Sequence, residues 1–339
     1  MSSGLAGPGT ATPSRIPTPP SHRKRVDVDA LRNLHGNLGS LMNLAFHTLA
    51  LIGRFQDPRV AEAMTALAAH AQSRGLTVLV DDAASLPVTA PVKRLPEAQL
   101  AARAQLLVSV GGDGTLLHTA RLATGIDVPL LGINRGRLGF LADISASEML
   151  ERFDDVLQGR FSEDRRHLLQ ARIVANGQAD RVMQALNDVA LQKCETGRML
   201  DFETWIDGCF VNSHGGDGMV IATPTGSTAY ALSCGGPILT PHLDALVLAP
   251  ISPHTLSDRP IVIDRRCLVE IKPVAQAPMR AQVTCDGLVF GDLPMDGRLV
   301  IEPIEAMVRL LHPPGYDYYR ILRSKLHWGR GVRVGQTDL

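Results

Sequence analysis

An apolar run that ends abruptly in a glycine-rich turn constrains the fold of this chain more than any other feature. Residues 104–110 are largely apolar, Gly111-Gly112-Asp113-Gly114-Thr115 follows, and apolar residues return at helical spacing over 116–120. This order predicts a strand, a turn and a helix. Glycines let the backbone approach a ligand, and the N–H groups at a helix start attract anions. The stretch favours a phosphate-binding loop; the alternative is an ordinary turn with Thr115 as helix cap and Asp113 adding N-terminal charge.

The segments around this loop predict a doubly wound α/β domain over residues 44–159. The expected elements alternate along the chain: strands over 46–53, 76–80 and 128–133, and helices over 57–74 and from Pro96. Such alternation is typical of parallel sheets, whose ligands bind at the carboxyl ends of the strands. A last helix is expected over 145–158, because Ser145 and Glu148 have the spacing of a capping box.

The pattern then changes to short β-branched runs between residues 168 and 311. Several runs are separated by turn pairs: Asp207-Gly208, Asp286-Gly287 and Asp296-Gly297. We expect a mostly antiparallel, β-sandwich-type domain over 160–312. The tail, 313–339, is basic and helical and is expected to dock back on the α/β domain.

Length, charge and cysteine content limit the possible functions. At 339 residues the chain exceeds the usual size of a single core, so two domains are expected. Its 34 basic and 34 acidic residues cancel and only 4% are aromatic, which argues against nucleic-acid binding and for small-molecule partners. The 5 cysteines form no C-x-x-C pair, which favours a reducing cytoplasm over disulfides or zinc. No apolar run reaches the roughly 18 residues that a membrane span needs.

The first 43 residues are predicted to be a disordered leader. They are rich in Ser, Pro, Gly and Thr and then basic, without the apolar core of a signal peptide. A transit peptide is the alternative, although prolines interrupt the segment. Met42 precedes the first expected strand and is a possible true start.

Residues 223–233, Thr-Pro-Thr-Gly-Ser-Thr-Ala-Tyr-Ala-Leu-Ser, are unusually rich in hydroxyl groups. The pattern predicts a turn followed by one or two helical turns, with Ser227 as the cap and Tyr230 exposed. Hydroxyls and free N–H groups suit phosphates, ribose or a base edge. A Ser/Thr-rich capped turn without a ligand is the alternative.

Two further polar clusters interrupt apolar runs. Asn187-Asp188 lies within one such run and must find partners there, either in a turn or in a ligand. Gly215-Gly216-Asp217-Gly218 precedes an apolar strand, and its spacing alone favours a hairpin turn.

Together these motifs resemble bacterial NAD kinases, in order and spacing, from about residue 46 to the end. The matching segments are 111–115, 132–141 (Gly-Ile-Asn-Arg-Gly-Arg-Leu-Gly-Phe-Leu), 187–188, 217–218, 223–230, and 253–260 (Pro-His-Thr-Leu-Ser-Asp-Arg-Pro). The glycine-flanked aspartate is shared with 6-phosphofructokinases and diacylglycerol-type lipid kinases. The block that starts at Thr223 is the specific part.

The resemblance implies a Rossmann-like or phosphofructokinase-like α/β domain and a β domain that binds the dinucleotide. It implies transfer of the ATP γ-phosphoryl group to the 2′-hydroxyl of the adenosine ribose of NAD, giving NADP, with Mg²⁺ or another divalent cation arriving on ATP. Asp113 would take or orient the hydroxyl proton. It further implies a homodimer or homotetramer in which a neighbour completes the site.

By the same resemblance, fourteen positions would bind nucleotide, and none is a dedicated metal ligand. They are Asp113, Gly114, Asn187, Asp188, Arg198, Gly215, Asp217, Thr228, Ala229, Tyr230, Ala231, Leu232, Ser233 and Leu288. Asn187 and Asp188 would contact ribose and phosphates, Asp217 the nicotinamide end, and 228–233 adenine and ribose.

Two positions depart from the family pattern. Gly215 stands where many members have Arg, and a small residue there is associated with use of NADH as well as NAD. Leu288 stands where Gln is common, which puts one side-chain contact in doubt. A diacylglycerol-type lipid kinase and a non-catalytic NAD-sensing protein remain alternatives, while Cys234 and His254 are expected to serve in packing.

Overall fold

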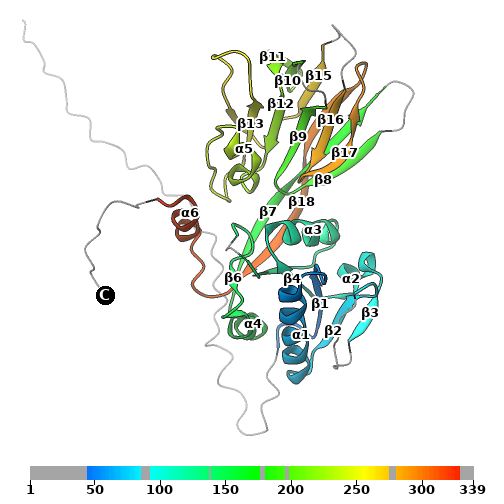
Figure 1. Ribbon diagram of the computed structural model, residues 1–339, viewed down its shortest axis with the longest axis vertical. Helices are drawn as coiled ribbons and strands as arrows, with labels where there is room; N and C mark the ends of the chain where they lie inside the picture. Colours follow the sequence, from blue (N-terminus) through cyan, green and yellow to red (C-terminus); the bar gives the residue numbers. More distant parts are fainter. Residues whose placement is uncertain are drawn as a thin grey trace, which may run out of the picture. The chain divides into compact units, whose positions relative to one another are not determined.

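The computed structural model describes residues 44–84, 92–136, 139–175, 180–194, 198–274 and 280–328 (Figure 1). The predicted leader, 1–43, the end of the tail, 329–339, and Arg137 and Leu138 of the glycine-rich motif lie outside these ranges. None of the helices within them is long and apolar enough to cross a membrane.

A parallel sheet with helices on both faces forms the α/β domain, as predicted. Its strands run in the order β3-β2-β1-β4-β5. The strands are β1 (Thr48–Gly53), β2 (Thr77–Asp81), β3 (Lys93–Leu95), β4 (Leu106–Gly111), β5 (Leu130–Asn134) and the short β6 (Ile144–Ser145). The helices are α1 (Pro58–Ser73), α2 (Glu97–Arg103), α3 (Asp113–Ala123) and α4 (Met149–Leu157).

Successive residues of the central strand β1 explain the two helical layers, because side chains alternate between the faces of a sheet. Leu49 and Leu51 are buried in a core that includes α1 and α4. Ala50 and Ile52 are buried in a second core that includes α2 and α3. The strand is therefore apolar throughout rather than alternating, as in other sheets covered on both sides.

The predicted start of α4 was wrong by one turn. Ser145 does not cap the helix, because it belongs to β6, where it pairs with Asn134. Its hydroxyl still donates to Glu148 Oε2 over 3.1 Å, but within the turn that precedes the helix. The helix begins at Met149.

The β domain consists of two packed layers, as the sandwich prediction required. One layer is an antiparallel sheet in the order β14-β13-β12-β9-β16-β17. Its strands are β9 (Asp188–Lys193), β12 (Gly218–Ala222), β13 (Ala245–Ile251), β14 (Ile261–Asp264), β16 (Ala281–Cys285) and β17 (Leu288–Leu293). The other layer contains β7 (Ser162–Val174), β8 (Arg181–Ala185), β10 (Leu200–Ile206), β11 (Cys209–Gly216), β15 (Val269–Pro273) and β18 (Arg298–His312). Side chains of both layers, among them Phe202 and Leu191, share one buried core.

Strand β18 ties the two domains into one sheet. It pairs antiparallel with β7 and β15 in the β domain and runs from there to the α/β domain (Figure 1). Its end pairs parallel with β5, where Leu310 lies opposite Leu130. The ends of β7 and β18 therefore lie beside the α/β domain. The domain limits at 159 and 312 stay a prediction.

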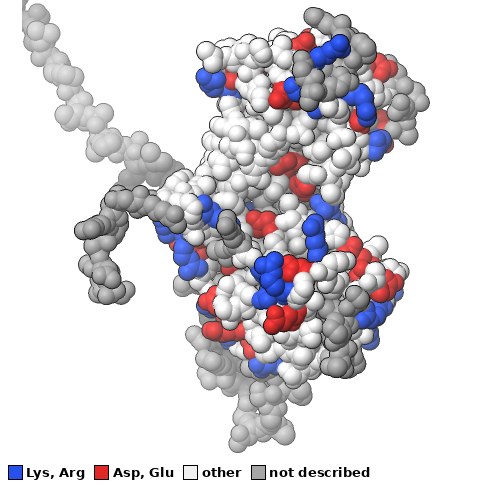
Figure 2. Space-filling model, viewed as in Figure 1, with Lys and Arg blue, Asp and Glu red and all other residues white. Residues whose placement is uncertain are grey.

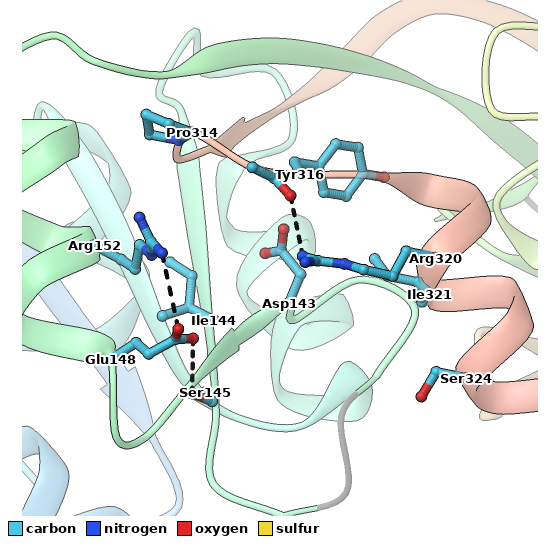
Figure 3. Close-up of a pocket in the computed structure, with 11 residues that line it drawn as sticks. Asp143, Ile144, Ser145, Glu148, Arg152, Pro314, Tyr316, Arg320, Ile321 and Ser324 are labelled. Atoms are coloured by element: carbon cyan, nitrogen blue, oxygen red, sulfur yellow. Dashed lines mark hydrogen bonds and ion pairs between the residues drawn. The ribbon is translucent and has the colours of Figure 1, made fainter. Parts of the chain in front are cut away.

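Helix α6 (Tyr318–Leu326) follows β18 after a short turn. Asp317 caps it by accepting hydrogen bonds from the N–H groups of Tyr319 and Arg320. Residues of this helix line a cavity of about 360 Å³ together with β6 and α4 (Figure 3). On the molecular face drawn in Figure 2, basic and acidic side chains are interspersed, as equal numbers of the two predict.

Candidate active site

The glycine-rich loop has the predicted order of strand, turn and helix. Strand β4 ends at Gly111 and α3 begins at Asp113, with Gly112 as its N-cap. Thr115 is thus inside the helix, and the alternative that it caps the helix was wrong. A Cβ atom at Gly111 would lie 2.9 Å from Cβ of Thr115, so the turn needs a glycine there.

The Asp113 carboxylate is held by backbone donors of another loop. The N–H of Phe140 donates to Oδ2 over 2.8 Å, and those of Leu141 and Ala142 donate to Oδ1 over 3.1 Å each. A Cβ atom at Gly139 would lie 2.6 Å from Cγ of Asp113, so only a glycine lets the loop come this close. Three donors fix the position of the carboxylate.

A second carboxylate, that of Asp286, organises the segment around Asn187 and Asp188. Asp286 lies in the turn between β16 and β17 at φ 49°. Its carboxylate accepts hydrogen bonds from the N–H groups of Leu186 (3.0 Å), Asn187 (2.7 Å) and Asp188 (3.2 Å). The sequence pattern predicts only a turn at Asp286-Gly287, and nothing local distinguishes it from the other two Asp-Gly pairs.

The carboxyl groups of Asp188 and Asp286 therefore lie close together in a buried environment. The Asp188 side chain is buried, and this burial together with the nearby Asp286 charge raises the pKa of Asp188 to about 7. Burial also raises the pKa of Asp286, although its three N–H donors and Arg121 act in the opposite direction. Nη1 of Arg121, on α3, lies 3.9 Å from Oδ2 of Asp286. The α/β domain thus supplies a cation to this acidic pair.

A cavity of about 480 Å³ lies where α3 faces the β16–β17 turn. It joins Gly114, Thr115 and Arg121 of α3 to Asp286 and Leu288. The carboxyl ends of β1 and β2 complete it, with further lining from Gly53, Arg54, Phe55, Asp81, Glu97 and His118. This is the end of a parallel sheet at which ligands are expected.

The hydroxyl-rich segment packs directly on Asn187. The Thr223 hydroxyl donates to the Leu186 carbonyl over 2.6 Å, and the Thr223 N–H donates to the Asn187 carbonyl over 2.9 Å. The segment forms a 3₁₀ turn, η2 (Gly226–Thr228), and the short helix α5 (Tyr230–Ser233). Ser227 does not cap this helix: it is fully buried, its Oγ donates to the Pro224 carbonyl, and the Leu239 N–H donates to it.

The contact between Gly226 and Asn187 leaves no room for a side chain, since a Cβ atom at Gly226 would lie 2.8 Å from Cα of Asn187 and overlap its carbonyl. We expect Gly226→Ala to lower the free energy of unfolding by about 3 kcal/mol, because backbone must move on both sides. Chemical denaturation measures this. The control is Gly75→Ala, at φ 79° in open space, for which about 1 kcal/mol is expected. Equal effects of the two substitutions would contradict the close contact.

The position of Tyr230 beside strand β9 differs from the exposed one that was predicted. Tyr230 is half-buried rather than exposed, and its hydroxyl accepts a hydrogen bond of 2.7 Å from Nε2 of Gln192. Burial raises the pKa of Tyr230, and the charges of Asp217 and Asp188 contribute. Nζ of Lys193 lies 2.6 Å from Oδ1 of Asp217. Strand β9 thus connects Asp188, Tyr230 and Asp217.

The hairpin expected at 215–218 was wrong, because the chain crosses between layers there. Strand β11 pairs with β10 in one sheet, and β12 pairs with β9 and β13 in the other. Gly218 has φ 149°, and a Cβ atom on it would lie 2.9 Å from the Leu191 carbonyl carbon. Gly215 pairs with Asp201 across β10 and β11. Arg198 is exposed just before β10 and neither lines the cavity nor bonds either carboxylate cluster.

Two family models match the chain. The ATP-NAD kinase N-terminal domain matches residues 49–161, and the ATP-NAD kinase C-terminal domain matches residues 186–311. Among curated relatives, the NAD kinase of Methylococcus capsulatus is 46% identical over 285 residues, which cover 84% of this chain and 98% of the relative. The NAD kinase of Nitrosococcus oceani is 44% identical over 286 residues, with the same coverage.

Solved structures agree with the family models. Yeast NADH kinase, complexed with NADH, superposes with a TM-score of 0.78 at 25% identity and covers 86% of this chain and 90% of its own. An NAD kinase from Archaeoglobus fulgidus, in complex with ATP, superposes with a TM-score of 0.62 at 26% identity. The match covers 83% of this chain and 98% of that kinase. The resemblance to NAD kinases that the sequence motifs predicted is confirmed, and the family models and relatives favour a kinase of NAD over a lipid kinase. The chain belongs to the ATP-NAD kinase family of phosphotransferases.

Proposed function

We propose that this chain phosphorylates the 2′-hydroxyl of the adenosine ribose of NAD, with Asp113 as the group that takes or orients the hydroxyl proton. The observation that carries the proposal is the Asp113 carboxylate, fixed by three backbone N–H groups at the start of α3, where Gly114 lines the cavity. Phosphoryl transfer depends on position and charge more than on a strong base. A carboxylate that cannot rotate away fits this demand.

The cavity beside α3 would hold the triphosphate of the donor. Its lining offers the first turn of α3 and the cationic side chains Arg54 and Arg121, which suit an anion. Asp188, which Asp286 adjoins, would face the acceptor ribose instead. Because the pKa of Asp188 is about 7, a good part of this carboxyl is protonated at neutral pH and donates a hydrogen bond to a ribose or phosphate oxygen.

The divalent cation would enter as MgATP. Within the described ranges, no group of three or more His, Cys, Asp or Glu side chains is placed to hold a metal ion. Mg²⁺ usually keeps several waters and binds through substrate phosphates with one or two carboxylates, so a dedicated cage is not required. The Thr228–Ser233 segment would bind the adenosine part of NAD, with Asn187 at the ribose.

Formation of ADP and NADP from MgATP and NAD tests the proposal. We expect both products in equal amounts. NAD-dependent ADP release would be missing from a non-catalytic NAD-sensing protein, and a diacylglycerol-type kinase would release ADP with diacylglycerol vesicles instead. Either result would overturn the assignment.

Gly215 predicts acceptance of NADH as well as NAD. Residue 215 borders the strand crossing that carries Asp217, and a Cβ atom there would already lie 3.2 Å from Oδ1 of Asp201. We infer that a long polar side chain at 215 would reach the nicotinamide end, which the family resemblance places at Asp217. We expect Gly215→Arg to lower kcat/KM for NADH about tenfold while that for NAD changes less than about threefold. Gly215→Ser is the matched control, and equal use of NADH by all three proteins would contradict the idea.

We also propose a homo-oligomer in the cytoplasm. Apolar side chains are exposed on the edge strands of both β layers, namely Phe210 and Val211 on β11 and Ile261 and Val262 on β14. Such clusters suit contact with a second copy. All five cysteines are free thiols, which suits a reducing compartment.

A further inference from the structure

A buried histidine with no place in the sequence motifs lies behind the loop that holds Asp113. His312 ends β18 and its side chain is only 2% exposed. Its Nδ1 lies 3.0 Å from Oδ2 of Asp143, and its Nε2 lies 3.7 Å from Oδ2 of Asp164 on β7. The ring stacks on Tyr316, with 3.7 Å between ring centroids. Among the described residues, the ion-pair partners of the imidazole are thus two carboxylates, and its ring partner is a tyrosine.

The two carboxylates define the state of the imidazole. A neutral ring donates through one nitrogen only, whereas the imidazolium donates through both. Nδ1 makes a hydrogen bond to Asp143, whereas Nε2 has no hydrogen-bond partner among the described residues and meets Asp164 only at ion-pair distance. The two negative charges together favour the cation. Burial opposes this, but Asp143 and Asp164 outweigh it and raise the pKa of His312. Asp164 also faces Arg166, and the pKa of Asp164 is lowered to about 2 by His312 and Arg166 against the effect of burial.

Asp143 connects this cluster to the proposed reacting group. It follows Ala142 directly, and residues 140–142 provide the three N–H groups that hold Asp113. Asp143 Oδ1 is buried without a hydrogen-bond partner among the described residues, so His312 supplies the contact that fixes this carboxylate. Movement of Asp143 would therefore move the loop that positions Asp113.

The other side of the cluster leads to the hydroxyl-rich segment. Arg166 donates from Nε and Nη2 to Asp164, and from Nη1 to Oγ1 of Thr225 over 3.2 Å. Thr225 is the residue before η2, whose last residue, Thr228, begins the proposed adenosine-binding stretch. The histidine cluster thus lies between the loop that holds Asp113 and the segment that would hold NAD.

We propose that protonated His312 is a positioning residue of the phosphoryl-transfer reaction, which clamps Asp143 and thereby fixes the 139–142 loop around Asp113. The proposal rests on the role of Asp113 given above. Asp143 and Tyr316 also line the cavity of about 360 Å³ beside α6 (Figure 3). Because Asp143 lines this cavity, the buried pair can exchange protons with solvent through it, so the clamp responds to pH. It is complete while His312 is charged and is lost as the pH rises through the pKa of His312.

Two substitutions test the clamp. His312→Phe keeps the ring on Tyr316 and removes both donors, while Asp143→Asn keeps the shape of the partner and removes its charge. We expect each to lower kcat about tenfold or more and to leave KM for ATP within about twofold, because the reacting geometry changes and the donor cavity does not. His70→Phe is the matched control: His70 pairs with Asp154 between α1 and α4 over 2.8 Å, away from the loop, and its loss should leave kcat unchanged.

The pH profile separates positioning from mere stability. Removal of the Asp143 charge takes away one cause of the raised pKa of His312, so the alkaline limb of kcat in Asp143→Asn should move down by about one pH unit. Melting temperatures are measured alongside, and kcat is measured well below them. An alkaline limb at the wild-type position, or kcat within twofold of wild type in Asp143→Asn, would overturn the proposal even if His312→Phe fails to fold.

The rate of Asp113→Asn shows whether a negative result overturns the role of His312 or the role proposed for Asp113. If Asp113→Asn keeps its rate while Asp143→Asn loses its own, the clamp acts on the loop but Asp113 is not the reacting group. If Asp113→Asn is inactive and both clamp variants are normal, Asp113 stands and the clamp is wrong.

Discussion

Asp113→Asn is expected to lower kcat for NADP formation by about 10³-fold, within the range that general acid–base groups contribute. The amide cannot take the proton of the ribose hydroxyl. Its NH₂ group would also face at least one of the three N–H donors that now point at the carboxylate, so the side chain must rotate or shift. Initial rates with saturating MgATP and NAD measure the loss, and KM for NAD should change little.

A surface carboxylate offers the control. Asp127 has an 85% exposed side chain and pairs with Arg309 over 2.8 Å. Asp127→Asn removes one negative charge, as Asp113→Asn does, and should leave kcat unchanged. Because Asp113 also orders a loop, the melting temperature of Asp113→Asn is needed beside the rates. A fully active Asp113→Asn enzyme would contradict the mechanism, although not the family.

Local patterns were enough to predict the α/β domain and its loop. The apolar strand that ends at Gly111, the glycines and the helical spacing after Thr115 act over a few residues, so the sequence contains all that fixes them. The α4 boundary was wrong because Ser145 has a second role: its backbone pairs with Asn134, more than ten residues away, and this pairing places it in a strand.

The organising role of Asp286 could not be predicted in the same way. Its partners are the N–H groups of 186–188, 98 to 100 residues earlier in the chain. An Asp-Gly turn has the same sequence whether its carboxylate faces water or another segment. The same holds for His312, which ends β18 and meets Asp143 only because β18 joins the α/β sheet. Contacts of this kind depend on topology rather than on local pattern.

Glycine spacing alone gave a wrong prediction at 215–218, where the chain crosses between the two layers instead of forming a hairpin. Glycine is favoured both in hairpin turns and where two backbones meet closely. At Gly218 the second reason holds, since the backbone lies against Leu191 of a neighbouring strand. The crossing brings Asp217 to Lys193 on β9, next to the other site residues, which a hairpin within one sheet would not do.

We expect the ionisable Asp188 side chain to lower the stability of the folded protein while contributing to its activity. Asp188 has a pKa of about 7 in the folded protein, whereas the ordinary pKa of an aspartate is 3.8. Between these values the folded state binds the extra proton, so stability falls as the pH rises from about 4 to 7 and stays low above that. Asp188→Asn removes the ionisation. We expect it to raise the free energy of unfolding by on the order of 3 kcal/mol at pH 8 and to change it little at pH 4.

The same substitution should lower kcat/KM for NAD about tenfold or more, because a carboxyl proposed to contact the acceptor ribose is lost. Denaturation curves at pH 4 and pH 8 and initial rates at pH 8 measure the two effects. Asp286→Asn is the informative contrast, since its amide would face three N–H donors and should destabilise the fold at both pH values. If Asp188→Asn were no more stable than wild type at pH 8, Asp188 would be ionised at little cost, and its proposed role as a hydrogen-bond donor at neutral pH would be wrong.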